Sequence, residues 1–183
     1  VICSDKTGTL TRNEMVATAV AAAGQLYEVD GDGYAPEGTV SRGQSAVLAS
    51  EHPVLLEAAR IMALCNDAAL HQSSDGWRAE GDPMEAALLA LAGKLSGEGA
   101  RPFADWTRTD AIHFDAAHRY MAVLVHDHEG RARIDVKGAP EAVLALCAKA
   151  RVQPGMIRQR GHFQFLQRRR DRIDAVAGRR IDD

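Results

Sequence analysis

The residues with the clearest potential for chemistry stand at the start of the chain. Asp5-Lys6-Thr7-Gly8-Thr9-Leu10-Thr11 directly follows the apolar Val1-Ile2-Cys3. A carboxylate at the carboxyl end of a buried strand lies where ligands bind in open α/β sheets, and it can attack a phosphoryl group to give an aspartyl phosphate. Gly8 suits a tight loop whose backbone N–H groups approach a phosphate. The alternative interpretation of Asp5 is a solvated aspartate at a strand-to-turn junction, because short motifs also match by chance.

Two other polar runs favour surface positions. His126-Asp127-His128-Glu129 contains metal-ligand types, but it coincides with the expected turn of a hairpin, where polar residues gather anyway. Arg168-Arg169-Arg170 lacks the interleaved aromatic residues of many nucleic-acid-binding surfaces, so a solvated tail is favoured and no nucleic-acid partner is expected. The sequence contains no GxxxxGK[ST], HExxH, GxSxG or GxGxxG motif.

The composition is that of an ordinary globular protein. The 183 residues are 46% hydrophobic and 26% charged, with a formal net charge of −3. A chain of this size buries about 70% of its unfolded surface. The three cysteines lack CxxC or CxxH spacing, which favours free thiols in a reducing compartment over a structural zinc site. No apolar run approaches the about 20 residues of a transmembrane helix, so the sequence predicts no membrane-spanning segment.

Hydrophobic periodicity predicts three helices. The first covers Pro53 to Asn66. The second begins at Pro83, after Asp82 as N-cap, and Glu85 stands at the reciprocal position of a capping box. The third covers Pro140 to Lys149. The apolar stripes expected on the first two helices consist of Leu55, Ala58, Met62 and Cys65, and of Leu88, Leu91 and Leu95.

Strands are expected between these helices. Residues 15–23 and 25–29 resemble two short extended segments around a turn. Residues 120–137 alternate with period two on both sides of a polar turn, which predicts a β-hairpin with one buried face. The apolar side chains that alternate with polar or smaller ones are Met121, Val123 and Val125, then Ala132, Ile134 and Val136. An Arg-rich helix over 163–177 is a weaker expectation.

The seven-residue run at the start matches the phosphorylation signature of P-type ATPases, and the resemblance continues to about residue 149. Further landmarks of that family occur in the family's order. They are Gly33-Tyr34-Ala35-Pro36-Glu37-Gly38, Leu64-Cys65-Asn66-Asp67, Gly81-Asp82-Pro83-Met84-Glu85-Ala86-Ala87-Leu88, Phe114-Asp115 with Arg119-Tyr120-Met121, and Lys137-Gly138-Ala139-Pro140-Glu141. The chain resembles the type II cation pumps, which include the calcium and sodium/potassium pumps, and not the heavy-metal pumps.

The resemblance implies an α/β (α+β) fold. Residues 13–150 would form the nucleotide-binding domain, an antiparallel sheet with flanking helices. Residues 1–12 would supply the first strand and phosphoacceptor loop of a haloacid-dehalogenase-like phosphorylation domain. Residues 151–183 carry nine Arg, no Lys and four Asp, whereas residues 1–150 carry 13 Lys and Arg against 21 Asp and Glu. We therefore expect an atypical Arg-rich tail that arises from truncation or a shifted reading frame.

The resemblance also implies roles for residues of the first loop. Asp5 would be the phosphoacceptor, and its carboxylate would hold Mg²⁺ together with the backbone carbonyl of Thr7. Lys6, Thr7, Gly8 and Thr9 would form the phosphate loop. Related phosphatases place a second aspartate where this chain has Thr7. Because threonine cannot act as that general base, the aspartyl phosphate should persist long enough to drive a conformational cycle.

Four residues match the family's nucleotide pocket. Adenine would stack on Phe114 near Glu85, and the phosphates would lie near Lys137 and Arg119. Three of the matches have a structural alternative: Phe114 as a core phenylalanine, Glu85 as a capping-box glutamate and Lys137 as a solvated lysine at a strand end. Many relatives carry Arg two residues after the Phe, where this chain has Ala116, so weaker phosphate contacts are expected. Arg119 can still pair with phosphate bidentately.

The sequence is therefore identified as a fragment of a P-type ATPase that couples ATP hydrolysis to cation transport across a membrane. The implied cofactors are ATP and Mg²⁺, and the implied partners are the transmembrane, actuator and remaining phosphorylation domains of the pump. This segment would lie on the cytoplasmic side and would not bind the transported cation. Because the Thr-Gly-Asp and Gly-Asp-Gly-x-Asn-Asp motifs do not occur, the isolated chain is expected to be inactive. The alternatives are a soluble nucleotide-binding module and a haloacid-dehalogenase-type phosphatase, against which Thr7 argues.

Overall fold

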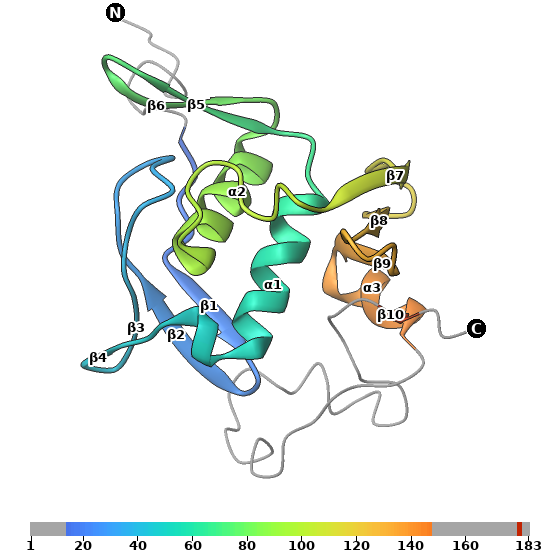
Figure 1. The fold of residues 1–183 in the computed structure, drawn as a ribbon, viewed down its shortest axis with the longest axis horizontal. Helices are drawn as coiled ribbons and strands as arrows, with labels where there is room; N and C mark the ends of the chain where they lie inside the picture. Colours follow the sequence, from blue (N-terminus) through green and yellow to red (C-terminus); the bar gives the residue numbers. More distant parts are fainter. Residues whose placement is uncertain (1–13, 148–178, 181–183) are drawn as a thin grey trace, which may run out of the picture.

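The computed structural model describes residues 14–147 and 179–180 (Figure 1). The expected phosphoacceptor loop, the expected helix over 163–177 and the boundaries at residues 12 and 150 lie outside the described residues. The described part contains two four-stranded antiparallel sheets, a two-stranded hairpin and three α-helices. The mixed fold of antiparallel sheets with flanking helices is confirmed.

The first sheet has the strand order β1-β2-β3-β4 and lies beside the helices. Its strands are β1 (Ala19–Ala22), β2 (Gln25–Val29), β3 (Val40–Arg42) and β4 (Ser45–Ala46). Ala23 and Gly24 join β1 to β2 and have φ angles of 49° and 72°, the left-handed conformation that a tight hairpin turn requires. The strand expected over 15–23 is shorter than predicted, and the N–H of Met15 donates to the Tyr34 hydroxyl at 3.3 Å.

Two helices pack side by side at the centre of the molecule (Figure 1). A short 3₁₀ helix, η1 (Ala49–Glu51), precedes α1 (Pro53–Leu64), and α2 (Pro83–Ser96) follows the hairpin. The predicted N-cap of α2 is confirmed, because Asp82 Oδ1 accepts from the N–H groups of Met84 (2.9 Å) and Glu85 (3.1 Å). The reciprocal half of the capping box is wrong: Glu85 Oε2 accepts instead from the N–H of Asp67, at 2.6 Å.

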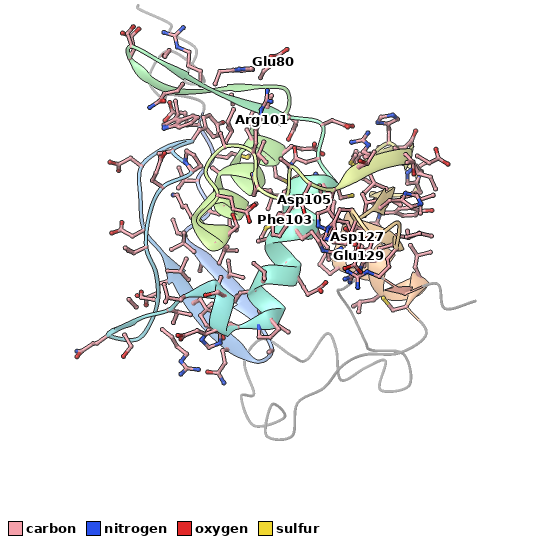
Figure 2. All side chains as sticks on the ribbon, in the orientation of Figure 1. Glu80, Arg101, Phe103, Asp105, Asp127 and Glu129 are labelled. Carbon is pink, nitrogen blue, oxygen red and sulfur yellow. The ribbon has the colours of Figure 1, made fainter. Side chains whose placement is uncertain are left out.

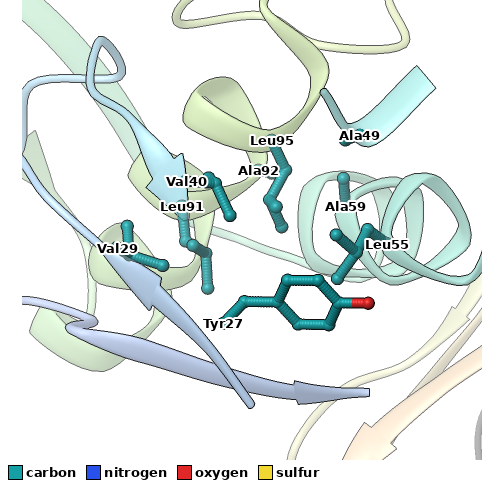
Figure 3. Packing of buried hydrophobic residues seen from close by; sticks show 9 residues of the cluster. All are labelled: Tyr27, Val29, Val40, Ala49, Leu55, Ala59, Leu91, Ala92 and Leu95. Atoms are coloured by element: carbon teal, nitrogen blue, oxygen red, sulfur yellow. The ribbon is translucent and has the colours of Figure 1, made fainter. Parts of the chain in front are cut away.

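The largest core cluster lies between the first sheet and the two helices (Figure 3). Its members are Tyr27, Val29, Val40, Ala49, Leu55, Ala59, Leu91, Ala92 and Leu95. The expected stripes are only partly correct. Leu55, Cys65, Leu91 and Leu95 are buried as predicted, whereas Ala58, Met62 and Leu88 are half-buried. The helices are covered on more than one side, so residues outside a single stripe, such as Ile61 and Leu89, are buried as well.

The second sheet has the strand order β10-β9-β8-β7. Its strands are β7 (Thr107–Ile112), β8 (Tyr120–His126), β9 (Ala132–Gly138) and β10 (Arg179–Arg180). The predicted hairpin is confirmed as β8 and β9. Met121, Val123 and Val125 are buried on the face that packs against Ile61 and Cys65 near the end of α1.

The prediction for the buried face of β9 is wrong. The register pairs Val123 with Asp135 and Leu124 with Ile134. Directly opposed residues of an antiparallel pair share a face, so the charged members of β9 join the buried face of β8. Asp135 is accordingly 0% exposed, whereas Ile134 is 37% exposed. The inner face of β9 therefore carries Arg133, Asp135 and Lys137.

Two smaller elements complete the described fold. The hairpin of β5 (Ala69–Ser73) and β6 (Gly76–Glu80) lies against α2. The helix α3 (Pro140–Leu146) packs on β9 and buries Val143 and Leu144. The predicted helix over 140–149 thus ends earlier, and Cys147 is extended. Among the helices of the described residues, none is long and apolar enough to cross a membrane.

Of the two cysteines in the described part of the chain, Cys65 is the more deeply buried from solvent. It is 0% exposed, its Sγ donates to the Met121 carbonyl at 3.5 Å, and burial raises its pKa to about 11 although Lys137 acts in the opposite direction. Because the thiolate is the reactive form, we expect iodoacetamide at pH 8 to alkylate the half-buried Cys147 well before Cys65. Peptide mass spectrometry measures both rates. In denaturant the two rates should be equal. Equal rates in the native chain would contradict this prediction.

Candidate functional site

Charged side chains line the inner face of β9 and pair with α1. The Arg133 guanidinium donates to both carboxylate oxygens of Glu57, at 3.1 and 2.8 Å. Arg60 donates to Asp135 at 3.1 Å and to Glu57 at 2.9 Å, and its guanidinium lies 4.8 Å from the centre of the Trp106 ring. A buried charge is tolerated only when it is paired. This cluster therefore fixes β9 on α1.

The third charged residue on that face is Lys137. It contacts Glu85, another residue that the sequence predicted as part of the site. Lys137 Nζ lies 2.8 Å from Glu85 Oε1, and both side chains are largely buried. The two groups form an ion pair, and Lys137 Nζ has no hydrogen-bond partner among the described residues. Glu85 comes from the first turn of α2, where the helix dipole favours a carboxylate. The structure thus brings together the ends of β9 and α2.

Arg119 lies beside the segment that contains Lys137. Its backbone is left-handed with φ 58°, its carbonyl accepts from the N–H of Ala139 at 2.9 Å, and its guanidinium pairs with Glu141. A Cβ on Gly138 would lie 2.6 Å from the Tyr120 Cα, closer than any real side chain can. Glycine is therefore required in this motif, because the loop before β8 passes directly over it. Arg119, in the loop before β8, therefore lies close to Gly138, the residue that follows Lys137.

Phe114 is 56% exposed in the loop between β7 and β8. The alternative of a core phenylalanine is therefore wrong. The connection from Phe114 to Glu85 is indirect: the neighbouring His113 bonds to Asp67, whose N–H donates to Glu85. A freely exposed ring can accept a planar group on its face.

Sequence reasoning gave no role to Asp67, Arg108 and His113. Asp67 accepts from Arg108 Nη1 at 2.8 Å and from His113 Nδ1 at 2.9 Å. Partial burial raises the pKa of Asp67, but the hydrogen bonds from His113 and Arg108 outweigh burial and hold it below its usual value. The available signal was the Leu-Cys-Asn-Asp motif that contains Asp67, but its partners lie far away in the sequence.

Asn66, in the same motif, joins the two central helices. Its Nδ2 donates to the carbonyls of Met62 and Glu85, both at 2.9 Å, and its Oδ1 accepts from the N–H of Ala68 at 2.9 Å. All the hydrogen-bonding groups of this amide are therefore used. The end of α1 and the first turn of α2 are held in one geometry, which positions Glu85.

The His126–Glu129 run forms the β8–β9 turn, as the sequence predicted. Asp127 Oδ1 accepts from the N–H groups of Glu129 and Arg131, both at 2.9 Å, and Figure 2 shows Asp127 and Glu129 at this turn. His126 Nδ1 lies 3.1 Å from Thr109 Oγ1. Among the residues that the structure describes, no group of three or more His, Cys, Asp or Glu side chains is arranged to hold a metal.

The fold and the paired charges define an α/β domain with a polar site where β8, β9, α2 and the loop before β8 meet. Comparison with known families gives its class: residues 55–167 match the family model described as "P-type ATPase, cytoplasmic domain N". The chain belongs to the P-type ATPase family, and the resemblance drawn from the ordered motifs is confirmed.

Curated relatives support the type II, cation-pump character. The chain is 41% identical over 162 residues to "Cation-transporting ATPase pma1" of Synechocystis sp., covering 86% of this chain and 18% of that protein. It is 34% identical over 146 residues to "Calcium-transporting ATPase" of Bacillus subtilis, covering 79% and 16%, and 35% identical over 151 residues to "Calcium-transporting ATPase type 2C member 1" of Bos taurus, covering 80% and 15%. The chain thus spans less than a fifth of the length of these relatives.

Proposed function

We propose that this chain supplies the ATP-binding domain and the phosphoacceptor Asp5 of a pump that couples ATP hydrolysis to cation transport. The observation that carries the proposal is the ion pair between Glu85 and Lys137. The two residues belong to motifs that lie far apart in the sequence, and both motifs were predicted to contribute to one nucleotide pocket. Arg119 lies in the loop before β8, where its carbonyl accepts from the N–H of Ala139, two residues after Lys137, and Phe114 is exposed in the same loop.

The two cations of the site are held by carboxylates that phosphate can replace. Lys137 pairs with Glu85, and Arg119 pairs with Glu141. Each pair restrains the side chain of its cation before a nucleotide arrives, which reduces the conformational entropy lost on binding. Phosphate oxygens would then take the ammonium and the guanidinium, while adenine stacks on the exposed Phe114 ring.

The phosphoryl-transfer half of the proposal rests on sequence. Asp5 and the carbonyl of Thr7 would hold Mg²⁺, which neutralises developing charge on transferred phosphoryl groups when it is bound. An oxygen of the Asp5 carboxylate would form the bond to the γ-phosphorus as the bond to ADP breaks. The transmembrane, actuator and remaining phosphorylation domains would come from the rest of the pump. The 183-residue chain alone should bind ATP without turning it over, because the Thr-Gly-Asp and Gly-Asp-Gly-x-Asn-Asp motifs do not occur in it.

An ATP titration by calorimetry tests the nucleotide site. We expect saturable binding to the purified chain and about tenfold weaker binding to Phe114→Ala, since one stacked base contributes about 1–3 kcal/mol. The matched control is Leu26→Ala, which truncates another exposed apolar side chain, 62% exposed on β2. A folded chain that binds no ATP, or an equal affinity for the two variants, would count against the proposal.

A further inference from the structure

Asp67 joins two parts of the proposed nucleotide site, the Phe114 loop and α2, and connects them to β7. Its carboxylate accepts from Arg108 on β7 and from His113, the residue before Phe114. Its backbone N–H donates to Glu85 on α2 at 2.6 Å. Arg108 also donates to the carbonyl of Asn66 at 3.1 Å, so this residue of β7 is hydrogen-bonded to both Asn66 and Asp67. One residue therefore contacts both elements that carry the proposed adenine contacts, the Phe114 loop and α2.

The loop that carries Phe114 is closed on itself. His118 Nε2 donates to the His113 carbonyl at 3.2 Å, and the N–H of Arg119 donates to the Asp115 carbonyl at 2.7 Å. Such a loop moves as a unit, and its position depends on what holds its ends. The far end is bonded to Ala139 through Arg119. The near end is bonded to Asp67 through His113.

We propose that Asp67 is a positioning residue that holds the Phe114 loop against Glu85, so that the stacking ring and the glutamate face the same nucleotide. The inference rests on the proposed ATP site and goes beyond it, because it assigns a role to Asp67, His113 and Arg108. These residues need not touch the nucleotide. They act by fixing the distance between the loop and the first turn of α2.

An imidazole in either protonation state can make the contact that His113 makes with Asp67. A neutral imidazole donates one hydrogen bond from Nδ1 to Asp67, and a protonated one adds the attraction of opposite charges. The other charged or titratable groups around this contact are Arg108 from β7, Glu85 from α2 and His118 from the loop. Because the pKa of Asp67 is lowered, its carboxylate loses its stabilising effect only as pH falls below the usual range for aspartate. Between pH 5.5 and 8.5, Asp67 thus stays charged and can accept this hydrogen bond.

The test is ATP affinity by calorimetry at several pH values between 5.5 and 8.5, each variant compared with the natural chain at the same pH. This comparison cancels the titration of the ATP phosphates. We expect His113→Ala and Asp67→Asn to weaken binding about tenfold, the loss of about one hydrogen bond to a charged group. His113→Asn keeps a donor near the position of Nδ1. It should bind ATP more tightly than His113→Ala, because the hydrogen bond to Asp67 is restored.

The matched control is the other exposed histidine–carboxylate pair, His71 and Glu80, at 3.0 Å on the β5–β6 hairpin, where Figure 2 labels Glu80. His71→Asn should leave ATP affinity and its pH dependence unchanged. If His113→Ala and His71→Asn behave alike while the natural chain binds ATP, the positioning role is wrong and the proposed function stands. If the folded natural chain binds no ATP, the proposed function is wrong, and the positioning role falls with it. If Asp67→Asn is unfolded, the ATP affinities of the two His113 variants alone test the positioning role.

Discussion

Replacing Asp135 by alanine is expected to lower the free energy of unfolding by about 3–5 kcal/mol, the usual cost of removing one partner of a buried ion pair. Asp135 is completely buried, and the Arg60 side chain that donates to it is 4% exposed. The variant would leave Arg60 with Glu57 as its remaining carboxylate partner among the described residues. Urea unfolding followed by tryptophan fluorescence measures the effect, since the Trp106 ring lies 4.8 Å from the Arg60 guanidinium.

Two further variants test whether the loss comes from the buried Arg60 charge that Asp135 no longer pairs. Asp75→Ala removes the partner of Arg78 in an exposed pair at a similar distance, 3.0 Å, and should cost less than about 1 kcal/mol. The double variant Arg60→Met with Asp135→Leu should cost less than the sum of its single changes, because no buried charge remains. Arg60 Nη1 and Asp135 Oδ2 have no hydrogen-bond partner within the described residues, so the natural pair is itself incompletely satisfied. An Asp135→Ala variant as stable as Asp75→Ala would refute the argument.

Burial dominates the electrostatics of this aspartate. It raises the pKa of Asp135, while the charges of Arg60 and Arg133 act against it. A carboxyl whose pKa is higher in the folded than in the unfolded chain binds a proton more readily when folded. Its contribution to stability is therefore greatest at low pH and falls as pH rises from the usual aspartate value to the raised one. The pair fixes β9 on α1 at an energetic cost.

Sequence features that act locally predicted the local structure well. The cap of α2 follows from Asp82 and Pro83, which need only the next three residues to make their contacts. The β8–β9 hairpin follows from strict alternation around a polar turn. The face of β9 could not be predicted in this way. Alternating apolar and charged residues fit either orientation until the register with β8 and the charges on α1 and α2 are known.

The candidate site was predictable to a similar extent. Ordered motifs pointed to Glu85 and Lys137, and the structure shows them in contact. The sequence gave no reason to pair Asp67 with His113, because the two lie 46 positions apart and a histidine next to a strand is an ordinary surface residue. Residues that act through another residue have no chemical signature of their own. Their role becomes visible only through the distances that folding creates.

Replacing Lys137 by methionine is expected to weaken ATP binding about 10- to 100-fold, because a hydrogen bond to a charged group contributes about 1.5–3 kcal/mol. Methionine preserves the length of the apolar stem and removes the ammonium. Adenosine, which has no phosphate, should bind the variant and the natural chain equally well. Lys94→Met is the matched control: it removes another buried lysine, in the last turn of α2, surrounded by Asp30, Asp32 and Glu37. That variant should leave ATP affinity unchanged.

Glu85→Gln then separates the two functions of the ion pair. In the free chain Glu85 holds the ammonium of Lys137, so ATP phosphates compete with this carboxylate for the same cation. A neutral glutamine competes less, and the ratio of ATP affinity to adenosine affinity should therefore rise. Adenosine itself should bind more weakly, because Glu85 is proposed to contact the adenine side of the pocket. A ratio that falls in Glu85→Gln, or an adenosine affinity that falls with ATP affinity in Lys137→Met, would mean that Lys137 supports the pocket as a whole and does not bind phosphate.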